Sequence, residues 1–331
     1  MPQVQPSAAA VVVPARGLTR LALVAADIKI SHSIFALPFA LLATFLSHAH
    51  LLSHQPANAD SAASSIAATA NAGRAPHWPT LALIVVCMVL ARTLAMAFNR
   101  WADAKLDALN PRTRGRAIPS GRLSGTVMLS VAFICAFAFV AASAGFWLLD
   151  GNLWPLLLSP VLIVYLAGYS YMKRFTWLCH VYLGTALALS PIAASIAVAP
   201  AFLSQPEPWL LAGMVTCWVA GFDIIYALQD VEPDRAIGIH SMPAKLGVEP
   251  ALWISRALHV GAMAMLVLLA MNSPHLSIGF RVGIGVVAAL LVLEHALVWG
   301  SKTHHIHMAF FTLNGVISVL LGGLGIWDVM N

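Results

Sequence analysis

Nine apolar stretches, each about as long as a membrane-spanning helix, dominate this 331-residue sequence. A helix needs roughly 20 mostly apolar residues to cross the hydrocarbon layer of a bilayer. The stretches lie near residues 33–52, 79–98, 124–149, 154–172, 177–199, 208–229, 251–271, 278–299 and 307–327. Since most of the connections between them are short, they predict one all-α polytopic bundle of about nine transmembrane helices in a lipid bilayer.

The composition excludes the main alternatives to a membrane protein. Only 9% of the residues are charged and 60% are hydrophobic, whereas a soluble domain carries about 25% charged residues. A soluble globular enzyme and a disordered chain are therefore excluded, and we expect no nucleic-acid partner. The Ala-rich start and Pro14 predict a flexible tail over residues 1–27.

The basic residues predict the orientation of the bundle, because Lys and Arg concentrate in cytoplasmic loops. With a cytoplasmic N-terminus and nine spans, all but three of the 18 Lys and Arg residues fall on the cytoplasmic side. The exceptions are Arg74, Arg281 and Arg92, and the last of these lies inside a span. We expect Arg92 and Glu294, which also lies inside a span, to satisfy each other or interfacial water.

Acidic residues gather at the cytoplasmic ends of two predicted helices. Asn99, Asp103 and Asp107 are spaced i, i+4, i+8, which places them on one helix face. The same spacing joins Tyr226, Asp230 and Asp234. Two facing rows of carboxylates suit Mg²⁺, which takes oxygen ligands and shares them with substrate phosphates. The alternative is that these acids only neutralise arginines at the membrane surface.

Basic residues on the same side complete this pattern. Arg112 and Arg116 follow the first acidic row, and Lys173 and Arg174 end the fourth predicted span. Guanidinium and ammonium groups suit the oxygens of a diphosphate, although such residues also serve as topology signals. Together with an apolar, lipid-facing interior, they predict a long-chain lipid diphosphate as substrate.

These motifs resemble the UbiA superfamily of intramembrane aromatic prenyltransferases, over nearly the whole chain after residue 27. The family pattern NxxxDxxxD with a downstream RTxxR is present as Asn99, Asp103, Asp107, Arg112-Thr113 and Arg116. The second pattern is present as Phe222-Asp223, Tyr226, Asp230 and Asp234. Residues 32–39, 169–175 and 314–318 resemble the 4-hydroxybenzoate polyprenyltransferases, so a single UbiA-like domain is expected over residues 28–331.

Two further segments are similar to one branch of this superfamily. Residues 175–180 and 238–244, which contain His180 and His240, resemble bacterial proteins assigned to menaquinone synthesis through futalosine. In many relatives a proline directly follows RTxxR, whereas here it is displaced by two residues to Pro119. This departure puts a strict ubiquinone-type acceptor in doubt and favours a dihydroxynaphthoate over 4-hydroxybenzoate.

The resemblance implies Mg²⁺-dependent transfer of a polyprenyl chain from polyprenyl diphosphate to an aromatic hydroxy acid. It implies an active site that faces the cytoplasm from a bacterial-type inner (plasma) membrane. Two Mg²⁺ ions are expected to be held by Asn99, Asp103, Asp107, Asp230 and Asp234. The diphosphate is expected to be bound by Arg112, Arg116, Lys173 and Arg174.

Three other residues receive expected roles from the same resemblance. Tyr226 is expected to steady an allylic cation through its ring, and Asp223 to orient or deprotonate the acceptor. Lys29 is expected to pair with an acceptor carboxylate, with a membrane-surface anchor as the alternative.

Haem or lipid prenylation by another branch remains an alternative function, and so does a secondary transporter. Transporters place charged groups near the bilayer midplane in broken helices. Since the acids here cluster at one interface beside basic loops, the sequence favours the enzyme.

Overall fold

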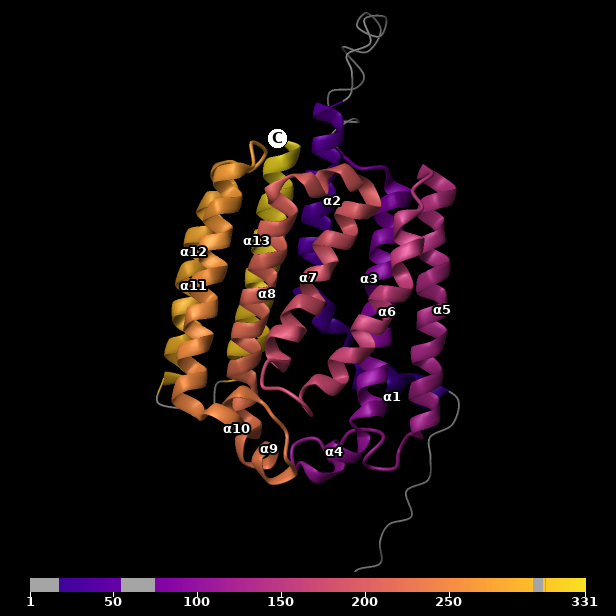
Figure 1. The fold of residues 1–331 in the computed structure, drawn as a ribbon, viewed down its shortest axis with the longest axis vertical. Helices are drawn as coiled ribbons and strands as arrows, with labels where there is room; N and C mark the ends of the chain where they lie inside the picture. The colour runs from indigo at the N-terminus through magenta and orange to yellow at the C-terminus, as the bar shows by residue number, and fades with distance from the viewer. Residues whose placement is uncertain (1–17, 55–74, 300–305, 307) are drawn as a thin grey trace, which may run out of the picture.

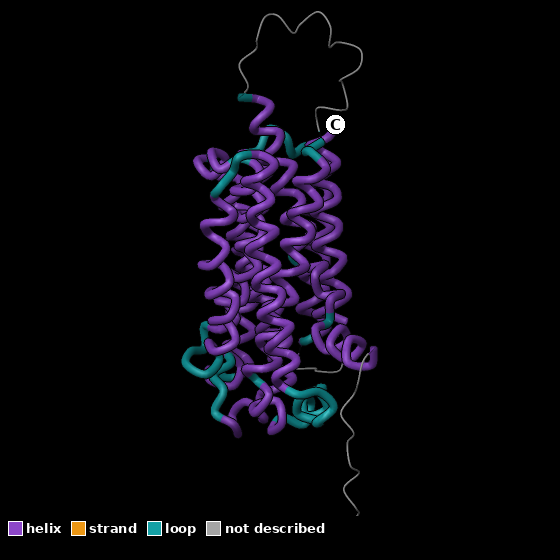
Figure 2. The backbone as a smooth tube through the Cα atoms, turned by 90° about the vertical axis from the view of Figure 1, so that its right-hand side faces the viewer, coloured by secondary structure: helices purple, strands orange, loops and turns teal. Residues whose placement is uncertain are grey.

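Helices are the regular elements of the computed structural model, which describes residues 18–54, 75–299, 306 and 308–331 (Figures 1 and 2). The long helices are α2 (Leu37–Ser53), α3 (Trp78–Ala102), α5 (Gly125–Asp150), α6 (Trp154–Met172), α7 (Cys179–Val198), α8 (Pro206–Ala227), α11 (Val248–Asn272), α12 (Ile278–Leu297) and α13 (Asn314–Met330). The shorter elements are α1 (Leu18–Ile28), η1 (Ile30–Phe35), α4 (Ala104–Leu109), η3 (Pro200–Ser204), η4 (Leu228–Asp230), α9 (Val231–Ile237), α10 (Met242–Leu246) and η6 (Met308–Leu313).

The number of spans agrees with the sequence. Eight helices in the described ranges are long and apolar enough to cross a bilayer. Residues 19–35 and helix α2 form a bent pair that could make one further span, which raises the number to as many as nine. Large apolar side chains such as Phe137, Val164 and Val260 are exposed on the outside of the bundle, where only lipid can cover them favourably. The chain is therefore an integral membrane protein with several spans.

Helix α1 corrects the predicted extent of the N-terminal tail. Leu18–Ile28 are helical rather than flexible, and Val24 and Ile28 are buried in an apolar cluster with Leu94 of α3. Burial of one apolar stripe explains why this segment folds onto the bundle. Residues 1–17 of the predicted tail lie outside the described ranges.

Local sequence sets the ends of the long helices. The side chain of Ser124 accepts a hydrogen bond from the backbone N–H of Val127 and so caps α5 at its start. Gly151, with φ 68°, ends the same helix in the left-handed conformation that favours glycine. Pro155 and Pro206 stand in the first turns of α6 and α8, where a missing N–H costs no helical hydrogen bond.

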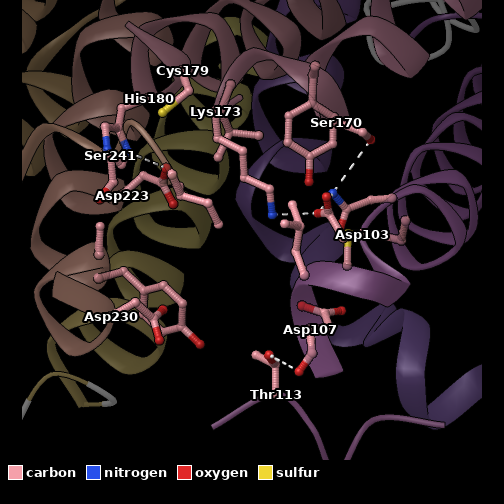
Figure 3. A pocket seen from close by; sticks show the side chains of 18 of the residues that line it. Asp103, Asp107, Thr113, Ser170, Lys173, Cys179, His180, Asp223, Asp230 and Ser241 are labelled. Carbon is pink, nitrogen blue, oxygen red and sulfur yellow. Dashed lines mark hydrogen bonds and ion pairs between the residues drawn. The ribbon is translucent and has the colours of Figure 1, made fainter. Parts of the chain in front are cut away.

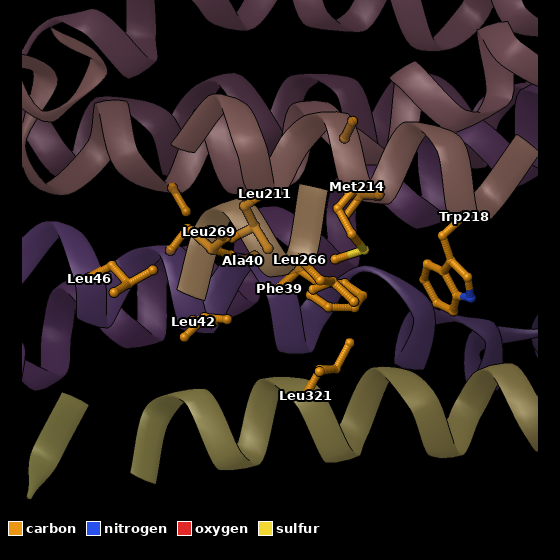
Figure 4. Packing of buried hydrophobic residues seen from close by; sticks show 14 of the residues in the cluster. Phe39, Ala40, Leu42, Leu46, Leu211, Met214, Trp218, Leu266, Leu269 and Leu321 are labelled. Atoms are coloured by element: carbon orange, nitrogen blue, oxygen red, sulfur yellow. The ribbon is translucent and has the colours of Figure 1, made fainter. Parts of the chain in front are cut away.

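The nine long helices form a closed ring. Each one packs against its neighbour in the order α2, α3, α5, α6, α7, α8, α11, α12 and α13, and α13 returns to α2. Helix α2 also crosses to α7, and the largest apolar cluster lies there. In that cluster Phe39 makes an edge contact with Trp218, 5.5 Å between ring centroids (Figure 4). Phe222 contacts the same indole ring edge-on, at 5.0 Å between centroids.

Small residues let the central helices approach closely, as is common where helices pack in lipid. A Cβ atom on Gly184 of α7 would lie 2.3 Å from the carbonyl oxygen of Thr216 on α8. The backbones of α7 and α8 are therefore in direct contact, and this contact sets the spacing of the two helices.

Buried polar groups on the last hairpin bond to other helices. Asn314 of α13 donates to Glu294 of α12 at 2.8 Å and accepts from the indole N–H of Trp218 at 2.7 Å. The expected pairing of Glu294 with Arg92 is therefore wrong, because the carboxylate of Glu294 faces α13. Arg92 lies instead on the wall of an internal pocket.

The short helices mark one end of the bundle. Helices α4, α9 and α10 lie together there, at the opposite end from the C-terminus (Figure 1), and α4 contacts α9 directly. The two acidic rows of the sequence are therefore brought to one face of the bundle by segments more than 100 residues apart.

The close contact at Gly184 can be tested through stability. We expect Gly184→Ala to lower the free energy of unfolding by about 1–3 kcal/mol, because the backbone of α8 must shift to admit the methyl group. In thermal unfolding in detergent this corresponds to a fall of roughly 5 °C. The matched control is Gly323→Ala on α13, where no atom lies within 4 Å of the added Cβ. Equal melting temperatures for the two variants would contradict this packing.

Candidate active site

A polar pocket of about 280 Å³ opens at the end of the bundle that carries α4 and α9 (Figure 3). The predicted site residues that line it are Lys29, Asn99, Asp103, Asp107, Arg112, Arg116, Lys173, Asp223, Tyr226, Asp230 and Asp234. Arg174 does not line the pocket, but it lies behind Asp103, with 3.3 Å between Nη2 and Oδ1. Lys29 stands at the rim, as the exposed residue before η1.

The first acidic row keeps its helical register across a break. Helix α3 ends at Ala102 and α4 begins at Ala104, yet the N–H groups of Asp103 and Asp107 still bond to the carbonyl oxygens four residues earlier. The amide nitrogen of Asn99 donates to Oδ2 of Asp103 at 2.7 Å. All three side chains are buried and face the same pocket.

Each carboxylate of the first row is bound by a cation. Nζ of Lys173 donates to Oδ2 of Asp103 at 2.6 Å, although the two residues lie 70 positions apart. One guanidinium nitrogen of Arg116 reaches both oxygens of Asp107 at 2.8 Å. Without these partners, two buried carboxylates in one pocket would carry a large desolvation cost.

The second row departs from ideal helix spacing. The 3₁₀ segment η4 separates Tyr226 on α8 from Asp234 on α9, so these residues do not share one continuous α-helical face. Asp230 is bound by the guanidinium of Arg112, with Nε 2.8 Å from Oδ1, and by the amide of Asn110 at 2.9 Å. Asp234 accepts a hydrogen bond of 2.6 Å from the hydroxyl of Ser241.

Arg112 connects the two rows, because it follows the first row in sequence and binds the second in space. Its Nη1 donates to the hydroxyl of Tyr226 at 3.1 Å, and its guanidinium lies 5.3 Å from the centre of that ring. Burial alone would lower the pKa of Arg112, but its hydrogen bonds to Asp230 and Tyr226 raise the pKa overall. The side chain therefore stays fully cationic.

A second, apolar cavity of about 400 Å³ adjoins the polar pocket. It is lined mainly by α3, α5, α6 and α7, and its lining residues on α6 run from Pro155 to Tyr169, about 21 Å at the α-helical rise per residue. Arg92, Tyr169 and Leu183 line both spaces. A molecule with a charged head and a long apolar tail would fit this pair of spaces.

Comparison with known proteins agrees with this geometry. The model of the UbiA prenyltransferase family matches residues 61–316 of the chain, which is more than three quarters of its length. The chain belongs to the UbiA prenyltransferase family.

Relatives and solved structures support this assignment along the chain. The 4-hydroxybenzoate octaprenyltransferase of Aliivibrio fischeri is 30% identical over 249 residues, 73% of this chain and 81% of the relative. That of Chromohalobacter salexigens is 28% identical over 262 residues, 77% and 83% of the two chains. The apo structure of a UbiA homolog from Aeropyrum pernix K1 has a TM-score of 0.74 at 28% identity, and the match covers 90% of this chain and 98% of that one.

A more distant structure shows the same fold. It is a UbiA homolog from Archaeoglobus fulgidus bound to GPP and Mg²⁺, with a TM-score of 0.66 at 16% identity, covering 93% of this chain and 99% of that one. The predictions of a UbiA-type fold and of a prenyltransferase similar to 4-hydroxybenzoate polyprenyltransferases are thus confirmed.

The donor set of this UbiA prenyltransferase fits Mg²⁺ in its chemistry. The candidate ligands are four carboxylates and one amide, all of them oxygen donors of the kind that Mg²⁺ prefers. Among the described residues, no three His, Cys, Asp or Glu side chains converge tightly enough to hold an ion. The reason is visible in the pairing, since three of the four carboxylates point at Lys173, Arg116 and Arg112.

Three residues of the UbiA prenyltransferase pocket had no site role in the sequence-based prediction. Arg92 is an inward-facing arginine whose Nε has no hydrogen-bond partner in the described part of the chain. Tyr169 lies one helical turn before Lys173 on α6, and this spacing could have revealed it. His180 binds Asp223 at 2.7 Å, a contact between two helices that no local pattern shows.

Proposed function

We propose that this UbiA prenyltransferase moves a polyprenyl chain from polyprenyl diphosphate to an aromatic hydroxy acid on the cytoplasmic side of a bacterial inner membrane. The acceptor that we favour is a dihydroxynaphthoate, on the route to menaquinone, and 4-hydroxybenzoate is the alternative. The observation that carries the proposal is that the polar pocket and the apolar cavity adjoin, with Arg92, Tyr169 and Leu183 in the walls of both. These two spaces match the diphosphate head and the prenyl tail of one substrate.

The charge pairs explain how the pocket would bind polyprenyl diphosphate, the donor of the prenyl chain. Arg112, Arg116 and Lys173 are held by carboxylates in the described structure. A diphosphate that arrives with Mg²⁺ offers both sides a new partner, because the acids can take the metal and the cations can take phosphate oxygens. The ligands that we propose for the metal are Asn99, Asp103, Asp107, Asp230 and Asp234. The Archaeoglobus fulgidus homolog, described as bound to GPP and Mg²⁺, supports the choice of Mg²⁺ as the metal.

The bond to be broken joins the first carbon of the prenyl chain to the diphosphate oxygen. When it breaks, both electrons leave with the diphosphate, and Lys173, Arg112 and Arg116 bind the additional negative charge. Bound Mg²⁺ would supply further stabilisation of that charge. Arg174, which lies behind Asp103, adds positive potential to the same side of the pocket.

Tyr226 is proposed to face the allylic cation, and the structure adds a condition to that role. Its ring packs at 4.2 Å against Phe310 and is approached by the guanidinium of Arg112. A guanidinium beside the ring repels a second cation and so weakens the attraction of the ring for it. Tyr226 would therefore stabilise the allylic cation more strongly once Arg112 has turned to the diphosphate.

The acceptor is proposed to lie between Asp223 and the basic side chains at the junction of the two spaces. Its hydroxyl group bonds to Asp223, and its carboxylate bonds to Arg92, with Lys29 at the rim. A ring carbon attacks the allylic cation, a carbon–carbon bond forms, and the ring then releases a proton to restore its aromatic system. Asp223 accepts a proton in this sequence, either from the hydroxyl group or from the ring.

Two observations bear on the choice of acceptor. The segments around His180 and His240 resemble the menaquinone branch, and His180 contacts the proposed acceptor residue Asp223. The curated relatives named above are 4-hydroxybenzoate enzymes, at about 30% identity, and they favour the alternative.

Direct assay decides between these acceptors. Membranes that contain the protein are supplied with Mg²⁺, a labelled polyprenyl diphosphate and either 1,4-dihydroxy-6-naphthoate or 4-hydroxybenzoate. We expect label in the naphthoate product, and at least a 100-fold loss of activity in Asp103→Asn, because one donor-site carboxylate is then missing. Product from benzoate alone would establish the alternative acceptor. No product from either acid would contradict aromatic prenylation.

The charge pairs predict that metal and diphosphate bind together. Mg²⁺ alone has to displace bound cations from the carboxylates, so we expect it to raise the melting temperature by no more than about 1 °C. Mg²⁺ with an unreactive prenyl thiodiphosphate at saturating concentration should raise it by about 5 °C or more. The measurement is thermal unfolding in detergent. A full shift with Mg²⁺ alone would show that the carboxylates form a metal site without the substrate.

Two lysines near the first acidic row provide a matched comparison. Lys173 lines the pocket and binds Asp103, whereas Lys105 lies between Asp103 and Asp107 in sequence but is exposed and faces away. We expect Lys173→Met to raise the KM for polyprenyl diphosphate about 10- to 100-fold, since a charged hydrogen bond is lost. Lys105→Met should change it by less than about twofold. Equal effects would mean that the lysines act only through the overall surface charge.

A further inference from the structure

His180 stands behind Asp223 at the start of α7, and its side chain is buried. Its Nδ1 lies 2.7 Å from Oδ2 of Asp223 on α8, and its Nε2 lies 3.2 Å from the backbone nitrogen of Met242 on α10. We propose that His180 is a positioning residue, which holds Asp223 as an oriented carboxylate toward the hydroxyl group of the acceptor. This inference rests on the proposed function.

The contacts of the ring identify where its proton lies. The backbone N–H of Met242, at the first position of α10, has no acceptor within its own helix and can only donate. Nε2 therefore accepts through its lone pair and carries no hydrogen. Nδ1 carries a hydrogen and donates it to Oδ2 of Asp223, which fixes the orientation of that carboxylate.

The partner of Asp223 differs in kind from the partners of the other acids. Asp103, Asp107 and Asp230 are each bound by Lys or Arg. The carboxylate of Asp223 is instead bound by the imidazole of His180, which orients it through one hydrogen bond. Asp223 is thus held without a Lys or Arg partner, whereas the other three acids are paired with the cations that we propose for the diphosphate.

One oxygen of Asp223 remains for the acceptor. Within the described ranges, the hydrogen bond to His180 is the one that the Asp223 side chain makes, and it uses Oδ2. The side chain is 22% exposed and lines the pocket, as Figure 3 shows. Oδ1 is therefore available to a hydroxyl group in the pocket.

His180 also connects the acceptor residue to the donor site. Met242, which binds Nε2, directly follows Ser241, and the hydroxyl of Ser241 donates to Asp234. One residue earlier, the N–H of His240 donates to the carbonyl oxygen of Lys173 at 2.8 Å. The segment that fixes the ring of His180 is thus bound to a proposed metal ligand and to the end of α6.

Two substitutions separate orientation from bulk. His180→Leu removes both ring nitrogens, and we expect it to lower kcat/KM for the aromatic acceptor about 10- to 100-fold, as is typical when the partner that orients a reactive group is lost. His180→Asn places an amide nitrogen at the position of Nδ1, so it should recover activity to within about fivefold of the wild type. The KM for polyprenyl diphosphate should be the same in all three proteins.

The matched control is His240→Leu, on the loop next to Met242, because the described structure places its side chain outside the pocket lining. We expect this variant to retain wild-type kinetics. The thermal shift with Mg²⁺ and prenyl thiodiphosphate, measured on every variant, reports whether the donor site is intact.

The outcomes separate this inference from the function on which it rests. Two results with an active wild type overturn the positioning role alone. One is an unchanged kcat/KM for the aromatic acceptor in His180→Leu, and the other is a kcat/KM in His180→Asn that is as low as in His180→Leu. A loss of the thermal shift in His180→Leu overturns it too, since the histidine would then support the fold. A wild type that shows the thermal shift but prenylates no aromatic acid overturns the proposed function and this inference together.

Discussion

Pairing of opposite charges at one end of an apolar bundle is the interaction on which the rest of this structure depends. Carboxylates at a membrane surface, enclosed by nine helices, would be too costly without partners. Three of these carboxylates are paired with Lys173, Arg112 and Arg116. Lys173 and Arg112 come from segments that are distant in sequence from their partners, and Arg116 comes from the loop that follows α4. The pairs draw α3, α6 and the α8–α9 region together, and they give the pocket its shape. The same groups that stabilise the substrate-free state are those that would bind a metal diphosphate.

In the described structure, the charges of these three carboxylates are neutralised by the basic side chains of the same pocket. A metal ion or a diphosphate alone would gain one set of partners and leave the other set buried and unpaired, which is the costly outcome for a charge in low dielectric. Both together exchange every pair for a new one. The expected preference for joint binding follows from charge balance alone. Under the same proposal, Arg112, which donates to the hydroxyl of Tyr226 in the described structure, would turn from that ring to a phosphate oxygen.

The features that were predictable from the sequence are those set by neighbours along the chain. Asn99, Asp103 and Asp107 share one face because hydrogen bonds between residues four apart continue through the break at Asp103. The number of spans follows from their length and hydropathy.

Contacts between distant segments could not be predicted in this way. Arg112 looked like a diphosphate ligand or a topology signal, and its contact with Asp230, 118 residues away, exists only because α4 packs on α9. Arg92 and Glu294 looked like partners because both are charged groups within spans, yet they face different neighbours. Helix α1 was not predictable from an apolar stretch of membrane-spanning length, because it has only 11 residues.

His180 shows that similarity between sequences does not reveal what a residue contacts. Its segment resembles one branch of the family, which bears on the acceptor, but the hydrogen bond to Asp223 on another helix appears only in the structure. In the structure it lies against the one acid in the pocket whose position inside a span is hardest to explain by surface pairing. Three carboxylates of the pocket are paired with Lys or Arg, and Asp223 is paired with a histidine. Under the proposed function, the first three would exchange their cations for a metal when the diphosphate binds, and Asp223 would remain oriented toward the acceptor. The kind of partner would thus divide the acids of one pocket between the two proposed roles.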